Sequence, residues 1–503
     1  MPTEATQISP KRDLPKAGLG FWMERVIEEC DHASVNFAAD PVHDLRVALR
    51  RCRSMADGLM AMDPDPGWKQ MKKAGKRLFG RLGELRDVQV MDEWVRRLGS
   101  PDDPVTSSLL QSLSGREAML KQEAAQALQE FDRKQWKRWS TLLPRRAARI
   151  PTGGLVFKHL ALERWTQAYA LHRRALQNRS QTAFHSLRIG LKRFRYIAEN
   201  FLPEQHAAWG RDLKELQDLL GEVHDLDVLW ATALRAQVFA DHDSHARWRQ
   251  RIRMEHDQRT TAYRTRMTGR HSLWNVWREQ LPQDRQIEAG ALGRFRLWAA
   301  NLDPEFRHSV HVARLALQLY DGLPRVGGVD TELRDPRDLL HVSALLHDVG
   351  RSGKDKAYHK TSYRLIRKIT PPLGWTAHDL ALLAIIARYH RGALPRTGQK
   401  ALRSLALGQR RVAVRLAAIL RLASALDADR SGRIQHLEVG ERNGFLVVSA
   451  RGYSALDGMA ETIASARHLL EIVYRRPVMV KELKSRTAKV LSMPVRKRGL
   501  SAR

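Results

Sequence analysis

The feature that most constrains the fold of this chain is an internal repeat. Residues 42–59 read VHDLRVALRRCRSMADGL, and residues 184–201 read FHSLRIGLKRFRYIAENF. A shift of 142 positions aligns a histidine and four basic residues: His43 with His185, Arg46 with Arg188, Arg50 with Lys192, Arg51 with Arg193, and Arg53 with Arg195. A basic helix that arose by chance would not have the same sequence pattern twice, so the repeat indicates a duplicated helical domain with pseudo-twofold symmetry.

Both copies place basic residues on one side of a helix. Positions i, i+3, i+7 and i+10 share a face, so each copy presents a histidine and three basic side chains as a stripe beside an apolar stripe. The likeness continues downstream, where KRLFGRLGELRDVQVM (76–91) aligns with KELQDLLGEVHDLDVL (214–229). The matched residues there are Lys76 with Lys214, Gly83 with Gly221, and Asp87 with Asp225. We expect the glycines to permit close helix contact and the aspartates to orient neighbouring arginines.

The motif H-x-x-R-x-x-x-(K/R)-R-x-R followed by L-G-x-x-x-D, present twice, resembles the CHAD family, the conserved histidine α-helical domain. The resemblance covers residues 18–275 and implies two four-helix bundles, at 18–148 and 155–275, around a basic cavity that binds inorganic polyphosphate. The residues expected to bind polyphosphate are His43, Arg46, Arg50, Arg53, Lys76, His185, Arg188, Lys192, Arg195 and Lys214. The two histidines either contact phosphate and gain charge as the pH falls, or are packed, hydrogen-bonded residues at a helix start.

The net charge agrees with an anionic partner. The chain has 86 Lys and Arg residues against 55 Asp and Glu residues, a formal net charge of +31. This excess indicates nucleic acid, an anionic membrane face or a phosphate polymer, with scattered solvated charge as the alternative. Polyphosphate has no base edges, so its binder needs a dense Lys/Arg surface that makes charge-assisted hydrogen bonds. Nucleic-acid binders usually add stacking aromatics, whereas helical spacing favours a core position for Phe194.

A second constellation lies in the C-terminal half. Residues 339–350 read LLHVSALLHDVG, an apolar helical run with an adjacent His347-Asp348 pair that ends on the helix-stop residue Gly350. An imidazole and a carboxylate supply one nitrogen and one oxygen ligand to a divalent metal, and they need partners from elsewhere. An isolated pair of this kind would mostly indicate a helix C-terminus, where the dipole favours a histidine.

Partners for this pair lie on or beside other apolar helical runs, and facing helices are where metal sites of helical bundles are built. The run at 306–320 presents His308 and His311, and the candidates taken from all the runs are His311, His359, His390 and Asp427.

The order H…HD…D in such helices resembles the HD superfamily of metal-dependent phosphohydrolases. The segments LHDVG, HKTSYRLI, YHR and LRLASALD are closer still to the C-terminal region of the exopolyphosphatase and guanosine-pentaphosphate phosphohydrolase family. The resemblance implies an α-helical HD domain at 304–430, with metal ligands at His311, His347, Asp348 and Asp427 and with His359 and His390 at a second metal. In that family, catalysis is attributed to an actin-like domain that precedes this region and contains Gly-rich phosphate loops. The sequence shows no such loops, so hydrolysis here would fall to the HD site.

The cofactor implied is one or two divalent metal ions, and the sequence does not distinguish Mn, Mg and Fe. Such an ion activates water and polarises a phosphoryl oxygen. Asp348 is then a ligand, while Lys354 and Arg391 are the candidates that hold substrate phosphate, with solvated surface positions as the alternative.

The remaining segments complete a mainly α prediction. Residues 276–303 form the connection between the domains, and strand-like runs around Asn443-Gly444 predict a small α+β appendix at 431–483. Residues 1–17 and 484–503 are a polar and a basic tail. Two cysteines, no signal core and no apolar run of about 18 residues predict a cytoplasmic protein without a membrane partner. Association with polyphosphate granules would agree with this location.

Three functions follow from these patterns. The favoured one is a polyphosphate-binding protein whose HD phosphohydrolase module cleaves a phosphate polymer or a phosphorylated nucleotide. The second is a non-enzymatic, granule-associated binding protein with a regulatory HD fold, and the third is a nucleic-acid-binding protein. A scaffold need not carry all four predicted ligands, which favours the first over the second, but the sequence leaves open whether the site is active.

Overall fold

The computed structural model describes residues 18–178, 180–324, 334–351, 357–396, 398–454 and 458–483. The two predicted tails and the candidate phosphate ligand Lys354 lie outside the described residues. The chain forms two compact units: unit 1 is Met1–Asn301 with Thr370–Trp375, and unit 2 is Leu302–Ile369 with Thr376–Arg503. None of the described helices combines the length and the apolar character that a membrane crossing needs.

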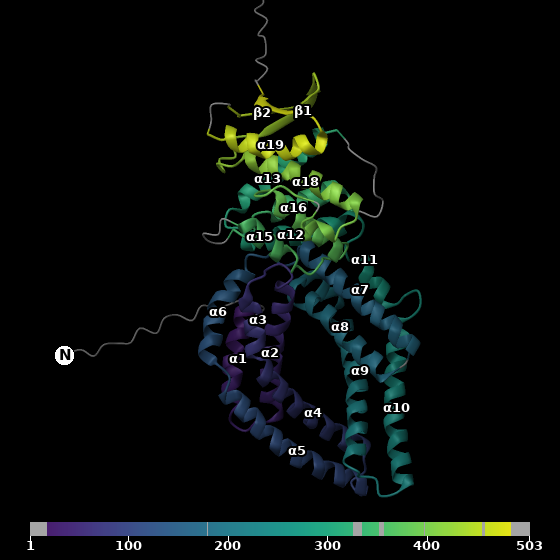
Figure 1. The fold of residues 1–503 in the computed structure, drawn as a ribbon. Helices are drawn as coiled ribbons and strands as arrows, with labels where there is room; N and C mark the ends of the chain where they lie inside the picture. The colour runs from purple at the N-terminus through teal and green to yellow at the C-terminus, as the bar shows by residue number, and fades with distance from the viewer. Residues whose placement is uncertain are drawn as a thin grey trace, which may run out of the picture. The chain divides into compact units, whose positions relative to one another are not determined.

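The first repeat of unit 1 is a set of packed helices in which α1 contacts α2 and α6, and α4 contacts α5. Two of its helices, α3 and α5, begin at an aspartate followed by proline, where the carboxylate accepts a hydrogen bond from a backbone N–H of the first turn. Proline suits the first helical position because its N–H would lack a partner there in any case. The helices are α1 (Leu19–Ala33), α2 (Ala39–Leu59), α3 (Pro66–Ala74), α4 (Lys76–Leu98), α5 (Pro104–Gln129) and α6 (Arg133–Ala147) (Figure 1).

The second repeat has the long helices that correspond to α2 and α4, and its helices pack in chain order. It consists of α7 (Leu155–Asn178), α8 (Gln181–Phe201), α9 (Pro203–Arg235) and α10 (His242–Met267), followed by α11 (Leu273–Glu279) and α12 (Arg285–Leu302). The stretch 276–303, predicted as a connection, therefore carries α12 and part of α11. Contacts between α2 and α8 and between α4 and α9 join the two repeats.

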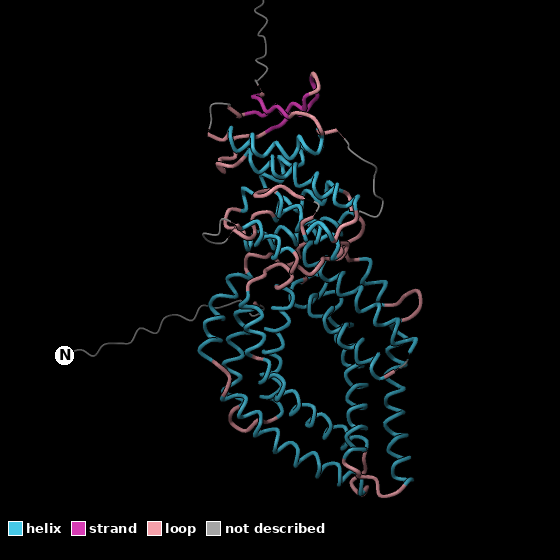
Figure 2. The backbone as a smooth tube through the Cα atoms, in the orientation of Figure 1, coloured by secondary structure: helices cyan, strands magenta, loops and turns pink. Residues whose placement is uncertain are grey.

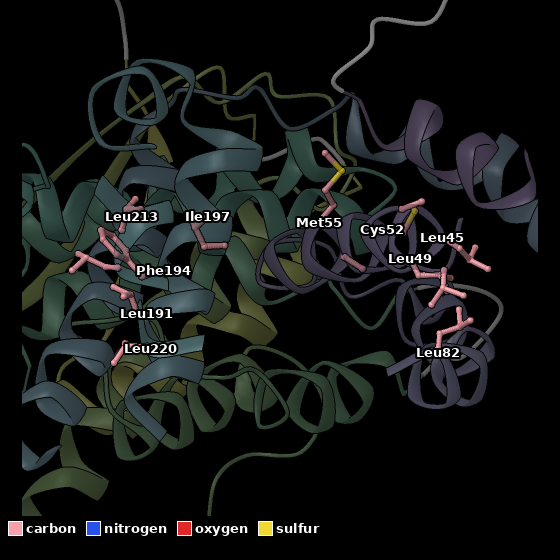
Figure 3. Packing of buried hydrophobic residues seen from close by; sticks show 14 of the residues in the cluster. Leu45, Leu49, Cys52, Met55, Leu82, Leu191, Phe194, Ile197, Leu213 and Leu220 are labelled. Atoms are coloured by element: carbon pink, nitrogen blue, oxygen red, sulfur yellow. The ribbon is translucent and has the colours of Figure 1, made fainter. Parts of the chain in front are cut away.

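The core of unit 1 repeats with the sequence. Buried residues of α2 and α4 match buried residues of α8 and α9: Leu49 with Leu191, Cys52 with Phe194, Met55 with Ile197, and Leu82 with Leu220. Figure 3 shows these side chains as two groups, one from each repeat. Phe194 is 0% exposed, which confirms its predicted core position. The apolar stripe of each repeated helix thus faces the core, so the basic stripe on its other side is left to face outward from it.

The helices of unit 2 pack around α16 and α18. They are α13 (Phe306–Gly322), α14 (Pro336–Leu346), α15 (Tyr358–Ile366), α16 (Ala377–Tyr389), α17 (Lys400–Arg403) and α18 (Leu407–Leu426). Helix α13 contacts α14 and α18, while α16 contacts α14, α15 and α18. A capping box fixes the start of α16, where Thr376 Oγ1 accepts from the Asp379 N–H at 3.1 Å and Asp379 accepts from the Thr376 N–H at 2.8 Å.

A small sheet forms the C-terminal part of unit 2. It consists of β1 (His436–Arg442), β2 (Phe445–Arg451) and β3 (Val478–Glu482), with α19 (Ala460–Tyr474) between β2 and β3 (Figure 2). Strands β1 and β2 are antiparallel. The turn residues Asn443 and Gly444 have φ of 49° and 79°, and a two-residue hairpin with a type I′ turn requires positive φ at both positions. Strand β3 pairs with β2 in parallel, and α19 packs on α18. The predicted fold class, mainly α with a small α+β appendix, is confirmed.

Candidate functional site

Basic side chains from both repeats converge where α2 packs on α8. Burial, followed by the charges of Arg50, Arg188 and Arg46, lowers the pKa of Lys192 to about 8. Burial also lowers the pKa of Arg46; Asp87 opposes this shift, and Arg50 and Arg188 add to it. Charges from one repeat thus lower the pKa of groups in the other, which requires that they lie close together. The shared region is called here the basic face: Arg46, Arg50, Arg188 and Lys192.

The charges of the basic face are mostly not neutralised. Arg46 Nη1 donates to the carbonyls of Leu82 (3.2 Å) and Gly83 (3.0 Å), and the Asp87 carboxylate lies 4.0 Å away. Arg188 Nε is buried and has no hydrogen-bond partner among the described residues. Within the described part of the chain, no carboxylate lies within ion-pair distance of Arg50, Arg188 or Lys192. Guanidinium and ammonium groups held without acidic partners are the chemistry that phosphate oxygens bind.

A side chain would fit at the repeated glycine of either repeat. A Cβ added to Gly83 would lie 3.8 Å from the Arg46 guanidinium, whereas nothing lies within 4 Å of a Cβ added to Gly221. The expected close helix contact is therefore absent at Gly221 in the described structure, and at Gly83 the neighbour is a side chain of the basic face.

The other predicted polyphosphate ligands differ in how they are held. Arg53 Nη1 donates to the Lys72 carbonyl at 2.6 Å, and Arg195 lies 3.5 Å from Glu199. Lys214 is exposed but acts with Arg195 and Arg50 on the carboxylate of Asp218, whose pKa is raised by burial. Lys76 is exposed at the start of α4, and no described interaction ties it to the basic face.

The two repeated histidines have neighbours that the sequence comparison missed. His185 Nδ1 lies 3.4 Å from His224 Nδ1, while partial burial and then Arg86 lower the pKa of His43. His224 and Arg86 occupy matching positions, one residue before Asp225 and Asp87. Burial, followed by Arg188, lowers the pKa of His224 to about 4. The sequence could have pointed to these two residues only through their position next to the repeated aspartates. Their residue types differ, histidine in one repeat and arginine in the other.

Unit 2 brings three histidines and an aspartate together from different helices. Ligand atoms of His308 on α13 and of His347 and Asp348 after α14 all lie within 4.8 Å of one another. His390, which follows α16, completes the set, with Nε2 3.9 Å from Asp348 Oδ1; His347 Nε2 lies 3.4 Å from the same oxygen. These four residues are called the histidine–aspartate cluster, and all four are buried.

Each histidine of the cluster is oriented through its Nδ1 atom. The partners are Asp427 Oδ2 for His308 (2.7 Å), the Ala344 carbonyl for His347 (2.7 Å) and the Ala387 carbonyl for His390 (2.5 Å). A proton on Nδ1 leaves Nε2 as a lone-pair donor, which is how metal-binding histidines are usually fixed. His347 Nε2, His390 Nε2 and Asp348 Oδ1 are buried without a hydrogen-bond partner in the described structure. Buried polar atoms are normally satisfied, so this set fits a divalent metal ion.

The structure places His308 rather than His311 in the cluster. His311, one turn further along α13, has Nε2 4.0 Å from Asp427 Oδ1 and Nδ1 2.9 Å from Arg314. Asp427 contacts the cluster through His308 and accepts a bond from the Gly432 N–H at 2.8 Å. His359 on α15 lies near enough to act on the pKa of His390 but is not among the grouped ligand atoms.

Arg430 binds the other oxygen of the cluster aspartate. Its Nη2 lies 2.7 Å from Asp348 Oδ2, and its Nη1 pairs with Glu305. Arg351 joins the same group, at 2.8 Å from Glu305 and 3.9 Å from Asp348. Arg430 has a left-handed backbone with φ of 59°, a conformation that costs a residue with a side chain free energy and that often marks a functional site.

A cavity of about 510 Å³ opens beside the cluster. Its lining includes His308 and His390 of the cluster and Tyr358 at the start of α15. It also includes four arginines and two residues of α19: Arg351, Arg391, Arg421, Arg430, Thr462 and Ser465. Arg391 Nη1 lies 3.3 Å from the Tyr358 hydroxyl, and Arg421 donates to the Gly392 carbonyl at 2.7 Å. The cavity thus combines metal-type donors with guanidinium groups, the set that a phosphate ester or anhydride requires.

Comparisons with known proteins match each of the two regions to a family model. Residues 26–234 match the family model of the CHAD domain, and residues 299–444 match that of the Ppx/GppA phosphatase, domain III. The chain is similar to the crystal structure of the CHAD domain from the plant Ricinus communis, at 18% identity and a TM-score of 0.35, over 54% of this chain and 89% of that one. No curated protein matches. The chain is thus similar to a CHAD domain followed by a phosphatase domain of this family, while the narrower HD assignment stays a prediction.

Proposed function

We propose that the protein binds inorganic polyphosphate on the basic face of unit 1 and hydrolyses a phosphate polymer or a phosphorylated nucleotide at the histidine–aspartate cluster of unit 2. The observation that carries the proposal is the group of buried donors without partners, His347 Nε2, His390 Nε2 and Asp348 Oδ1, beside a cavity lined by arginines. The polyphosphate part draws its support from the basic face and the CHAD similarity.

The residues that would hold a divalent metal are His308, His347, His390 and Asp348. When bound, such an ion lowers the pKa of a water ligand and polarises a phosphoryl oxygen. Three imidazoles to one carboxylate favour Fe over Mg, which prefers oxygen ligands. Since Arg430 engages Asp348 Oδ2, only Oδ1 is left to a metal, and the arrangement favours one ion over two.

The arginines of the cavity suit the binding of phosphate. Arg391 is exposed beside the Tyr358 hydroxyl, so both groups are placed to contact one phosphate unit. Arg351 and Arg430 carry two charges against Glu305 and Asp348, and they border the same cavity. Arg421 donates to backbone carbonyls and therefore positions the loop after α16 instead. Guanidinium groups hold phosphate through paired hydrogen bonds that also fix its orientation.

A non-enzymatic function is the second candidate, and one contact favours it. Arg430 already balances the Asp348 carboxylate at 2.7 Å, so the acid does not depend on a metal for a charged partner. In that case unit 2 regulates or recruits, and unit 1 alone supplies the phosphate binding. Nucleic-acid binding has less support, because Phe194, one of the two aromatics interleaved with basic residues in α8, is 0% exposed and cannot stack on a base.

The test is to measure the metal content of the wild-type protein beside a His347→Ala/Asp348→Ala variant, together with phosphate release from polyphosphate and from guanosine pentaphosphate. We expect stoichiometric metal in the wild type, and loss of both metal and release in the variant. Metal without release from either substrate would contradict the proposed substrate class. No metal and no release, with polyphosphate binding intact, would support the non-enzymatic candidate.

A further inference from the structure

A fixed seam joins the ends of α2 and α8, one helix from each repeat. Arg51 pairs with Glu199 and donates to Asn200 Oδ1 at 3.4 Å, while Asn200 Nδ2 donates to Ser54 Oγ at 3.0 Å. Beside this seam lies a pocket of about 220 Å³, lined by Ser54, Asp57, Lys72, Arg164, Arg193 and Tyr196. The lining comes from α2, α3, α7 and α8, so the pocket exists only because the two repeats meet.

The pocket carries more positive than negative charge. Three of its lining side chains are cationic and one, Asp57, is an acid that pairs with Lys72. Burial lowers the pKa of Arg164, Glu163 opposes this shift, and Arg193 adds to it, so the two guanidinium groups lie within electrostatic reach. Among the described residues, Arg193 has no carboxylate within ion-pair distance. Arg164 Nη1 lies 3.6 Å from Glu163 Oε1, and the same carboxylate also pairs with Arg294, so one acid is shared by two guanidinium groups. The pocket therefore keeps a net positive charge, which attracts an anion.

A buried hydroxyl points to the same kind of ligand. Tyr196 contributes an oxygen that is buried and has no hydrogen-bond partner in the described structure, although buried hydroxyls are normally paired. The phenol donates a hydrogen bond, which a phosphate oxygen accepts. The ring of Tyr196 also lies 5.8 Å from Lys192 Nζ, so this one side chain borders both the pocket and the basic face.

We propose that this pocket binds a terminal phosphate unit of a polyphosphate chain, held by Arg164, Arg193 and the Tyr196 hydroxyl. The proposal rests on the proposed binding of polyphosphate and adds the recognition of a chain end. Its volume of about 220 Å³ lies below the range of about 300–1,000 Å³ typical of sites for larger organic ligands. A chain whose last unit occupies the pocket continues past Tyr196 onto the basic face. Free pyrophosphate offers the same chemistry as a chain end and therefore serves as the probe.

The test compares two variants by calorimetric titration with pyrophosphate and with long-chain polyphosphate. Arg164→Ala/Arg193→Ala removes the two guanidinium charges of the pocket, and Arg46→Ala/Arg188→Ala removes two charges from the basic face. A matched control, Arg211→Ala/Arg253→Ala, removes two cations whose side chains are 91% and 80% exposed in the same unit. We expect the pocket variant to lose pyrophosphate binding at least tenfold and the other two variants to keep it. Tyr196→Phe, which changes only the hydroxyl, should weaken pyrophosphate binding severalfold without altering the fold.

Polyphosphate chains whose ends are blocked by an organic group test whether the pocket binds a terminal phosphate unit rather than an internal one. Capped chains should bind the wild type as they bind the pocket variant, whereas uncapped short chains should prefer the wild type. Pyrophosphate binding that survives in both Arg164→Ala/Arg193→Ala and Tyr196→Phe would overturn the proposal. So would an equal loss in the Arg46→Ala/Arg188→Ala variant, because the small anion would then sit on the basic face. Failure of long-chain polyphosphate to bind the wild type, with pyrophosphate still bound, would instead refute the proposed function and leave a pyrophosphate site.

Discussion

The basic face of unit 1 and the histidine–aspartate cluster of unit 2 both hold polar groups without partners, but they hold them differently. On the basic face, cations from two similar helices lie together and are only partly buried. Each cation of one repeat has an equivalent at the matching position of the other repeat. In the cluster, every histidine is fixed by a bond to Nδ1, and each remaining atom has a single position. One site is therefore defined by the amount of charge, the other by the placement of individual atoms.

This difference predicts different responses to substitution. Binding of a flexible polyanion sums many similar contacts, so losing one cation should cost a fraction of the affinity. Binding of a metal ion needs its complete ligand set in one geometry, so losing one ligand should cost nearly all of it. The substitutions below are ways to test whether the two sites behave in these two ways.

The largest effect is expected for His308→Ala. Removing His308 takes one imidazole from the cluster, so metal affinity should fall by about 1,000-fold or more, beyond the 10–100-fold typical of an outer-shell partner. Metal content after dialysis at fixed free metal measures this directly. His311→Ala is the matched control, because His311 lies three residues further on the same helix. We expect this variant to bind metal as the wild type does. The reverse result would restore the ligand assignment expected from the sequence.

A smaller, graded effect is expected on the basic face. Changing Arg46, Arg50, Arg188 and Lys192 to Ala should weaken polyphosphate binding by about 100-fold, or about 2.8 kcal/mol in total, since solvent-accessible charged contacts contribute on the order of 0.7 kcal/mol each. The slope of log affinity against log salt should fall by about 3, at roughly 0.7 for each charge lost. Each single substitution should cost severalfold only.

The control for this variant removes the same charge elsewhere in unit 1. Lys73, Arg211, Arg249 and Arg253 are all exposed, and changing the four to Ala lowers the net charge equally. If this control weakens binding as much as the basic-face variant does, the charge of the whole protein drives binding and the convergence of the two repeats does not. A single substitution that abolished binding would also contradict the contrast with the cluster.

Arg430→Gln should strengthen metal binding. The substitution removes a positive charge 2.7 Å from Asp348 Oδ2 and releases that oxygen, so affinity should rise by about tenfold, the order of magnitude of one partly screened charge nearby. Titration with Fe²⁺ or Mn²⁺ under anaerobic conditions measures both affinity and stoichiometry. A rise from one to two ions per chain would show that Arg430 limits the site to a single metal. Unchanged affinity would mean that Arg430 does not compete with the metal.

The sequence allowed the fold to be predicted further than the sites. A repeat at a constant shift, with apolar residues at helical spacing, predicts paired bundles and a buried Phe194, because both depend on local periodicity. The His347-Asp348 pair was recognisable since its two ligands are adjacent in the chain.

The remaining site residues depend on helix rotation and on contacts between distant segments. His308 and His311 are three residues apart on α13, so both lie near the same face, and only the packing of α13 on α14 and α18 selects His308. Arg430 belongs to no helix, and its backbone conformation brings it to Asp348. Arg164 and Arg193 approach each other only through packing of α7 on α8, which no sequence spacing reports.

The smallest effect expected is a dependence of polyphosphate binding on pH. With its pKa lowered to about 8, Lys192 is mostly charged at pH 7 and mostly neutral at pH 9 in the free protein. Binding should therefore weaken by about threefold to tenfold between these values, as one cation of the basic face is lost. The neighbouring arginines stay charged throughout, Tyr196 has a raised pKa, and Asp225, with a pKa of about 6, titrates below this range.

Stability should change with pH in the opposite direction, which separates this effect from general alkaline damage. The folded-state pKa of Lys192, about 8, lies below the value of about 10.4 expected in the unfolded chain. At a pH between these two values, the unfolded state therefore binds more protons than the folded state. The free energy of unfolding should rise from pH 8 to 10 while the affinity falls. Lys192→Arg, which keeps the charge, should remove both dependences. If the variant keeps the wild-type pH profile of binding, another group titrates, and the charges of the basic face are less strongly coupled than their mutual repulsion indicates.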